Sequence, residues 1–105
     1  MIGRGILTAE VKERAERYLN REFSQTELRL YPYLCDCALN SRRVERIKTT
    51  DEEQSIITRL EQEKRLRREY PSYMHPTREF FLFMQECLVD TYIEIADELS
   101  RHAQE

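Results

Sequence analysis

Glycine and proline are both scarce in this sequence. Its 105 residues include only two glycines, Gly3 and Gly5, and three prolines. Because these two residue types are the strongest interruptions of regular structure, few positions allow the chain to turn sharply. The scarcity therefore favours long helices.

Long apolar runs and a secretion signal are also missing. No stretch of about 18 apolar residues occurs, so we expect no membrane-spanning helix and no membrane contact. The start of the chain lacks the charged, apolar and small-residue regions of a signal peptide, which predicts a cytoplasmic protein. The three cysteines, Cys35, Cys37 and Cys87, are an odd number, so we expect reduced thiols packed in a core.

The sequence contains none of the common catalytic motifs. There is no nucleophile beside a base, no glycine-rich phosphate loop and no metal-binding box. Only two histidines occur, His75 and His102, and neither forms the Glu-x-x-His pair that a carboxylate metal site between helices requires. We expect a protein that is not an enzyme and has no cofactor, metal or small-molecule ligand.

What the sequence does contain is suited to one folded domain. Hydrophobic residues make up 40% of the chain and charged residues 35%, which is typical of a helical domain with a well-solvated surface. A chain of this length can bury one hydrophobic core. We expect residues 1–105 to form a single helical domain, with residues 1–7 as a flexible N-terminus.

The net charge of −3 is unevenly distributed. Residues 1–50 carry ten basic and seven acidic groups, whereas residues 79–105 carry one basic and seven acidic groups. This division predicts that a basic and an acidic surface face each other, within the chain or across a dimer, with a free acidic tail as the alternative. Five acids share one face of the last helix and are expected to be solvated or to meet the basic residues: Glu86, Asp90, Glu94, Asp97 and Glu98.

Two helices are expected in the first half of the chain. Thr8 precedes apolar residues spaced by three and four, which predicts a helix of about fifteen residues ending near Phe23. Ser24 and Glu27 have the spacing of a capping box, so a second helix should begin there. Pro32 would interrupt that helix, so either the helix kinks there or Pro32 is the first position of a restarted helix, and we favour a break near residues 30 and 31.

The restarted helix is expected to run to Thr49. Its apolar positions follow alternating steps of three and four, the pattern of a heptad seam: Leu30, Tyr33, Cys37, Asn40, Val44 and Ile47. Asn40 is the polar member of this seam. It either fixes the register between helices or is partly exposed and locally bonded.

Two further helices are expected in the second half. Thr50 and Glu53 form another capping-box pattern, which predicts a third helix reaching Tyr70. Residues 71–76 break the helical pattern and predict an ordered, aromatic-rich loop, with Pro76 at the first position of a last helix over residues 77–100. The predicted fold class is all-α: a four-helix (three to five helices) single-domain bundle with a long apolar C-terminal helix.

The last helix provides the candidate interface. Its apolar residues cover about half of the helix circumference, which is wider than one neighbouring helix can bury. Either the three shorter helices cover this arc, or the remainder binds a protein partner or forms a homodimer. The candidate interface residues are Phe81, Met84, Leu88, Tyr92, Ile95 and Leu99.

Two other groups of residues are candidate binding sites. Clustered cations on the second and third helices suit nucleic-acid phosphates, although solvated helix surface is the commoner use of such residues: Arg42, Arg43, Arg46, Lys64, Arg65 and Arg68. The loop before the last helix either holds an anion at the helix N-terminus or simply covers the core; its candidates are Tyr70, Tyr73, His75 and Arg78.

Two stretches of the sequence resemble the ArpU/RinA type of phage late-gene transcriptional regulator. Residues 27–34 (ELRLYPYL), leading into residues 44–47 (VERI), are similar to the early tyrosine-bearing helix of that family. Residues 91–100 (TYIEIADELS) look like the opening helix of a sigma-factor-like helix-turn-helix. In that motif a recognition helix follows, whereas only residues 101–105 follow here. The resemblance implies a regulator of transcription that lacks the recognition helix.

We therefore predict a small, non-enzymatic interaction or regulatory protein that acts through protein contacts and self-associates. The alternative is a phage-type regulator that binds nucleic acid through the basic face of the second and third helices, and we rank nucleic acid as the less favoured partner.

Overall fold

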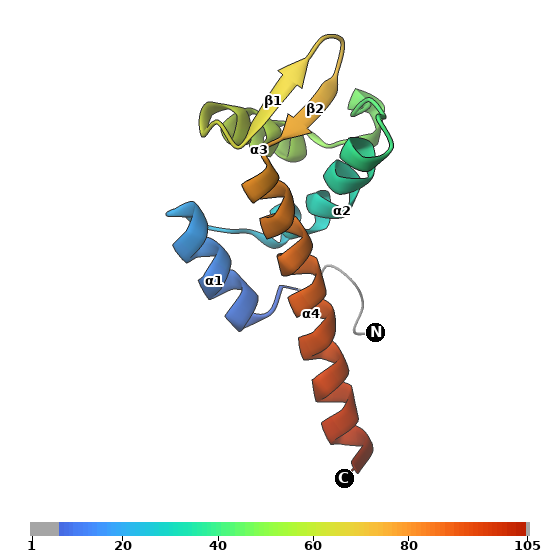
Figure 1. Ribbon diagram of the computed structural model, residues 1–105. Helices are drawn as coiled ribbons and strands as arrows, with labels where there is room; N and C mark the ends of the chain where they lie inside the picture. Colours follow the sequence, from blue (N-terminus) through green and yellow to red (C-terminus); the bar gives the residue numbers. More distant parts are fainter. Residues whose placement is uncertain (1–6, 105) are drawn as a thin grey trace.

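Figure 1 shows the arrangement of the helices and strands. The computed structural model describes the backbone of residues 7–104 and the side chains of residues 7–91. Its elements are α1 (Ala9–Leu19), α2 (Gln25–Leu39), the short 3-10 helix η1 (Arg46–Lys48), α3 (Asp51–Gln62), β1 (Leu66–Glu69), β2 (Tyr73–Pro76) and α4 (Arg78–Gln104). Of the terminus expected to be flexible, residues 1–6 lie outside the described residues, and Leu7 packs against the core.

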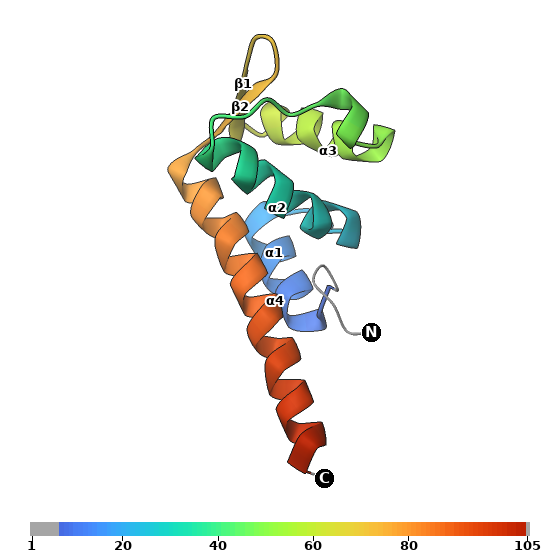
Figure 2. The same ribbon diagram turned by 90° about the vertical axis from the view of Figure 1, so that its right-hand side faces the viewer.

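Helix α4 is the longest element of the molecule. Helices α1 and α2 lie beside its N-terminal half, α3 and the hairpin lie at its N-terminal end, and its C-terminal half extends past α1 and α2 in both views (Figures 1 and 2). The molecule therefore measures 53 × 27 × 24 Å, with a radius of gyration of 14.7 Å. A compact domain of this size has a radius of gyration of about 13 Å. The extension of α4 accounts for the elongated shape.

The core lies where the first half of α4 meets α1 and α2, and it continues to α3, which packs against α2 and β1. Its largest fully buried side chains include Tyr31, Phe23 and Phe80. The rings of Tyr31 and Phe80 meet edge to face, with centroids 5.7 Å apart, which is a favourable geometry for aromatic pairs. Cys35, Cys37 and Cys87 are buried without disulfides, as expected for thiols that pack in a core.

The chain also contains a β-hairpin, so the expectation of an all-α fold was wrong. Strands β1 and β2 pair antiparallel in the register Leu66↔Pro76 to Glu69↔Tyr73. Helix α3 ends at Gln62 instead of reaching Tyr70, because Lys64 takes the left-handed conformation with a φ of 61°. Leu66 and Met74 then point into the core, each 5% exposed. The residues expected to form an aromatic loop make strand β2.

Helix α2 is continuous through Pro32, so the expected break at residues 30 and 31 was wrong. Pro32 itself is exposed, while Leu28, Tyr31 and Leu34 beside it are almost fully buried. A proline inside a helix costs about 3 kcal/mol, and each buried apolar side chain contributes roughly 1.5–3 kcal/mol. Packing of α2 against the core thus outweighs the cost of Pro32.

The expected seam stops at the end of α2, and its continuation to Thr49 was wrong. Asn40 caps the helix, and its side-chain amide donates to the backbone oxygen and the carboxylate of Asp36 at 3.0 and 2.7 Å. The prediction of a locally bonded, exposed Asn40 is confirmed. Beyond it Val44 is buried in the linker to α3, whereas Ile47 is 92% exposed.

The ends of α1 and α4 also differ from the expectation. Helix α1 stops at Leu19 because Asn20 adopts a left-handed conformation with a φ of 58°, and Phe23 is buried in the following linker. Pro76 belongs to β2, and Thr77 caps α4 instead, accepting a hydrogen bond of 3.1 Å from the backbone N–H of Phe80.

Helix α4 is long but not apolar throughout. It has 27 residues, and within its described side chains buried residues such as Phe80 alternate with exposed ones such as Leu82 and Val89. The structure therefore shows an amphipathic first half instead of an apolar helix. None of the helices in the described part of the chain has the length and apolar character needed to cross a membrane.

Candidate functional site

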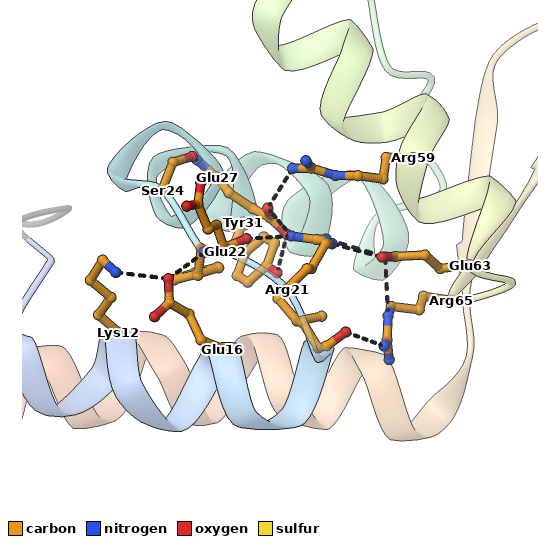
Figure 3. Close-up of polar contacts among 12 residues, drawn as sticks. Lys12, Glu16, Arg21, Glu22, Ser24, Glu27, Tyr31, Arg59, Glu63 and Arg65 are labelled. Atoms are coloured by element: carbon orange, nitrogen blue, oxygen red, sulfur yellow. Dashed lines mark hydrogen bonds and ion pairs between the residues drawn. The ribbon is translucent and has the colours of Figure 1, made fainter.

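A buried network of ion pairs joins the α1–α2 linker to α2 and α3 (Figure 3). Arg21 lies at its centre and uses all five of its N–H groups. Its two terminal nitrogens donate to the two carboxylate oxygens of Glu27 at 2.9 and 3.0 Å, and its Nε donates to Glu63 at 2.7 Å. The remaining bonds go to the backbone oxygen of Glu22 and to the second oxygen of Glu63.

Glu27 is fully buried, and both of its oxygens are occupied. Besides Arg21 it accepts a hydrogen bond of 2.7 Å from the Tyr31 hydroxyl and one of 3.3 Å from Arg59. Its backbone N–H donates to the Ser24 cap at 3.1 Å. A buried carboxylate with this many donors has no lone pair left for a substrate. We therefore assign the network a structural role.

The pKa values in this network follow from its burial and charges. Burial alone would lower the pKa of Arg21, but its hydrogen bonds to Glu27 and Glu63 raise it above the ordinary value. Burial, together with the nearby Glu27 charge, raises the pKa of Tyr31 well above its ordinary value. Both groups therefore keep their protonation state across the physiological range.

Arg65 extends the network to the base of the hairpin. Its Nε donates to Glu63 at 3.2 Å, and its guanidinium lies 5.0 Å from the centre of the Tyr18 ring. Its backbone oxygen accepts a 2.9 Å hydrogen bond from Thr77 at the start of α4. Arg65 is thus held against the body of the protein, and it does not belong to an open basic face as the sequence suggested.

The linker between α2 and α3 is joined to the hairpin. Arg43 and Tyr73 form an antiparallel bridge. Next to it, the backbone N–H of Val44 donates to the Ser72 oxygen at 3.0 Å, and the Ser72 hydroxyl donates to the Val44 oxygen at 2.9 Å. The Tyr33 hydroxyl accepts from the backbone N–H of Glu45 at 3.0 Å. The linker is therefore attached to both the hairpin and α2.

This junction gathers cations from two parts of the sequence. We call it the cationic end and define it by seven residues: Arg42, Arg43, Arg46 and Lys48 of the linker, with Lys64, Arg67 and Arg68 beside or within β1. The sequence pattern had predicted the cations of a basic face on two helices. Among these seven, only Arg46 and Lys48 lie in a helix, the single turn η1.

Most of these cations are exposed and paired with single acids. The exposed fractions of the Arg42, Arg46, Lys48 and Arg67 side chains lie between 62% and 69%. Lys48 pairs with Glu45 at 2.8 Å, Arg68 with Glu61 at 2.7 Å, and Arg42 with Asp36 at 3.4 Å. Within the described part of the chain, Lys64 has no ion-pair partner.

The residues of the predicted anion loop do not converge on one site. Tyr70 is 93% exposed at the hairpin turn, while Tyr73 pairs with Arg43 in the bridge. His75 lines a shallow surface hollow with Lys64 and Arg68, and its Nε2 lies 3.4 Å from Glu69. Arg78 is exposed in the first turn of α4.

The candidate interface on α4 divides into three parts. Met84 is 1% exposed and belongs to the core, so it is not available to a partner. Phe81 and Leu88 are half-buried and pack against the core. Tyr92, Ile95 and Leu99 lie in the half of α4 whose side chains are outside the described residues.

The acidic end of the chain contacts the basic front half at α1, away from the cationic end. The cationic end and the C-terminus of α4 lie at opposite ends of the molecule (Figure 1). Of the acidic face of α4, Asp90 forms an ion pair with Arg14 of α1, and Glu86 is exposed. Glu94, Asp97 and Glu98 lie outside the described side chains. Among the described residues, the ion pair of Asp90 with Arg14 is one contact between the acidic end and the basic front half of the chain.

Buried thiols and acidic clusters provide no metal site in the part of the chain that the structure describes. There, no group of three or more His, Cys, Asp or Glu side chains is arranged to hold a metal ion. Burial raises the pKa of Cys35 to about 11 and, with a smaller effect of Asp90, that of Cys87 to about 12.

Comparison of the chain with models of protein families, with curated proteins and with solved structures finds no match. The resemblance to ArpU/RinA-type regulators therefore depends on the two sequence stretches alone.

Proposed function

We propose that this chain is a small, non-enzymatic interaction protein that self-associates through the C-terminal half of α4. The observation that carries the proposal is the extension of this helix past α1, α2 and α3 (Figures 1 and 2). A helix of 27 residues is about 40 Å long. Among the helices that the structure describes, α1 and α2 lie beside only the first half of that length (Figures 1 and 2).

The sequence of the extending half supports a helical partner. Its apolar residues Tyr92, Ile95 and Leu99 follow Leu88 of the first half at steps of four, three and four, which is the spacing of a helix–helix seam. An isolated helix of a dozen residues is marginal in water. A second copy that packs along this stripe would bury apolar surface and stabilise the extending helix in both chains.

A second copy suits the stripe because one chain supplies an identical, self-complementary surface. Residues 92–104 contain three acids, Glu94, Asp97 and Glu98, against the single cation Arg101. The acids of two copies would repel each other, and salt screens that repulsion. Self-association through α4 should therefore become stronger as the salt concentration rises.

The test is the molar mass of the purified protein, measured by light scattering over a range of concentrations. We expect the mass of a dimer for the wild type and of a monomer for Leu99→Glu. The matched control is Ser100→Glu, which adds the same charge one residue away from the stripe, and it should remain dimeric. A wild type that is monomeric at high concentration, or equal effects of the two substitutions, would contradict the proposal.

A regulatory role of the phage type, as the sequence resemblance implies, is compatible with a dimer but does not follow from it. The alternative function, nucleic-acid binding by a basic face on α2 and α3, needs revision. Its cations lie in the linker and at the hairpin, or, for Arg65, in contact with the body of the protein.

A further inference from the structure

We infer that the cationic end binds duplex nucleic acid, with the linker and the hairpin contacting the phosphate backbone. This inference is independent of self-association by α4, because all of its cations belong to one chain. It differs from a helical basic face in both the residues and the elements that carry the charge.

Positive charge is concentrated in the two segments that form this end of the molecule. Residues 42–48 contain four cations and one acid, and residues 64–76 contain four cations and one acid. These segments are far apart in the sequence, but the bridge between Arg43 and Tyr73 brings them side by side. Clustered Lys and Arg side chains bind nucleic acid by replacing the counterions condensed on its phosphates.

Helix α3 and the following Glu63, which connect the two segments, carry five acids and one cation over residues 51–63. Four of those acids are engaged within the fold. Asp51 pairs with Arg46, Glu61 with Arg68, and Glu63 with Arg21, while Glu53 accepts from the Thr50 backbone N–H in a complete capping box. The charge of Glu63 is therefore compensated outside the cationic end, whereas Asp51 and Glu61 pair with two of its cations and must be displaced by a phosphate.

The ion pairs at the cationic end leave its cations available. Arg42, Arg46 and Arg67 are more than half exposed, and each pairs with one surface acid. Exposed ion pairs of this kind are weak and are screened by salt. A phosphate oxygen can therefore replace the surface acid in each of these ion pairs. Lys64 has no ion-pair partner among the described residues, so a phosphate can bind it without displacing an acid.

The backbone beneath these side chains is fixed. Val44 is bonded to Ser72 in both directions, and the following N–H is bonded to Tyr33 of α2. At the other side, the backbone oxygen of Arg65 is bonded to Thr77. Cations on a rigid base lose less conformational entropy on binding than cations on a mobile tail.

The shape of this end suits a duplex. Strands β1 and β2 form a two-stranded ribbon, an element that fits the major groove of B-form DNA. Tyr70 at its turn is 93% exposed, and Ile47 in the linker is 92% exposed between two cations. Exposed apolar side chains such as that of Ile47 are inserted between base steps by proteins that bind the minor groove.

The negative net charge of the chain does not oppose this binding. Acids predominate in the far half of α4, and that helix is about 40 Å long. The screening length in 0.1 M salt is about 10 Å. A phosphate at the hairpin is therefore largely unaffected by the acidic end of the molecule.

The experiment is fluorescence anisotropy of a labelled DNA duplex of about two helical turns, titrated with the full chain at 50 and 200 mM salt. We expect binding at the lower salt, weakened about 100-fold at the higher salt if four phosphates are neutralised. The double variant Lys64→Gly with Arg67→Gln should weaken binding at least tenfold and reduce the salt slope by about two.

The matched control removes the same charge elsewhere. Arg17 of α1 is exposed and pairs with Glu13 on the surface, and a second exposed cation of α1, Lys12, pairs with Glu16. The double variant Lys12→Gln with Arg17→Gln should bind the duplex like the wild type. Equal losses in both double variants would overturn the inference, since binding would then depend on net charge alone.

Two further outcomes would also overturn it: no binding of the duplex at 50 mM salt, or tighter binding of the single strand than of the duplex. The variant Leu99→Glu separates the two proposals, because it should be monomeric and still bind the duplex. If self-association fails in every assay but the wild-type monomer binds the duplex, only the proposal on α4 is lost.

Discussion

Arg21 and Glu27 meet through two parallel hydrogen bonds, one to each carboxylate oxygen, and the Glu27 side chain has no exposed surface. A paired arrangement of this kind is well oriented, but it brings a charge into the interior that depends on its partner. The buried Glu27 carboxylate therefore binds both the α1–α2 linker, through Arg21, and the last turn of α3, through Arg59.

Glu27→Gln should lower the free energy of unfolding by about 3–5 kcal/mol, because Arg21 is left partly buried without its main counter-charge. The measurement is urea denaturation followed by circular dichroism. Glu22→Gln, at an exposed position in the same linker, is the control and should change stability little. If Glu27→Gln does not fold, Tyr31→Phe tests the same network with a loss of about 1.5–3 kcal/mol. Unchanged stability in Tyr31→Phe would contradict the structural role.

The stability of the protein should fall as the pH drops below 4.5. Burial tends to raise the pKa of Glu63, but hydrogen bonds from Arg21 outweigh this and hold it below the ordinary value of 4.5. The stabilising effect is thus complete above the pKa of the unfolded chain and is lost as the pH falls through the lower folded-state pKa. Denaturation series from pH 7 to pH 3 measure it. Glu63→Gln should show a shallower decline over that interval, and an identical decline would disprove this origin.

Lys64→Gly should raise the free energy of unfolding by about 1 kcal/mol. Lys64 has a φ of 61°, a conformation that disfavours residues with a Cβ atom and that glycine adopts readily. Lys64→Ala removes the same charge but keeps the Cβ atom, so it should give no such gain. Equal stability of the two variants in chemical denaturation would show that the backbone at this position is not strained.

Pro32→Ala should also stabilise the protein, by up to about 3 kcal/mol. Pro32 lies inside α2 on its exposed side, so its removal restores a helical hydrogen bond without altering the core. Thermal unfolding is a suitable measurement. A decrease in melting temperature would mean that the path of α2 depends on the proline.

The three cysteines should resist alkylation in the folded protein at pH 8. All three are buried, and burial raises the pKa of Cys35 to about 11, whereas the thiolate is the reactive form. Mass spectrometry after treatment with iodoacetamide should find no label in the native protein and three labels in guanidinium chloride. Rapid labelling of native Cys35 or Cys87 would contradict the packing described for α2 and α4.

Local sequence signals located the helix starts but not the hairpin. Thr8, Ser24 and Thr50 each accept a hydrogen bond from a backbone N–H in the first turn of the helix that they precede. Such caps act within four residues, so the sequence displays them directly. The hairpin depends on pairing across a turn and on the left-handed conformation of Lys64. A lysine in a sequence does not indicate that conformation.

The sequence predicted which residue types form the candidate sites, but not where those residues lie in the structure. The sequence indicated clustered cations, and the structure places Arg43 beside Tyr73 through a bridge that no local pattern encodes. The network around Arg21 was missed, although Ser24 and Glu27 were identified as a cap. Ser24 does cap the helix, but the Glu27 side chain turns inward to Arg21 and Tyr31, a choice that depends on residues distant from the capping pattern.

The hydrogen bond from Val44 to Ser72 gives the cationic end a single reporter. Its amide proton is shielded only while linker and hairpin remain together. The deuterium uptake of that one amide therefore times the separation of the two segments, and a duplex that spans both of them would lengthen its exchange lifetime.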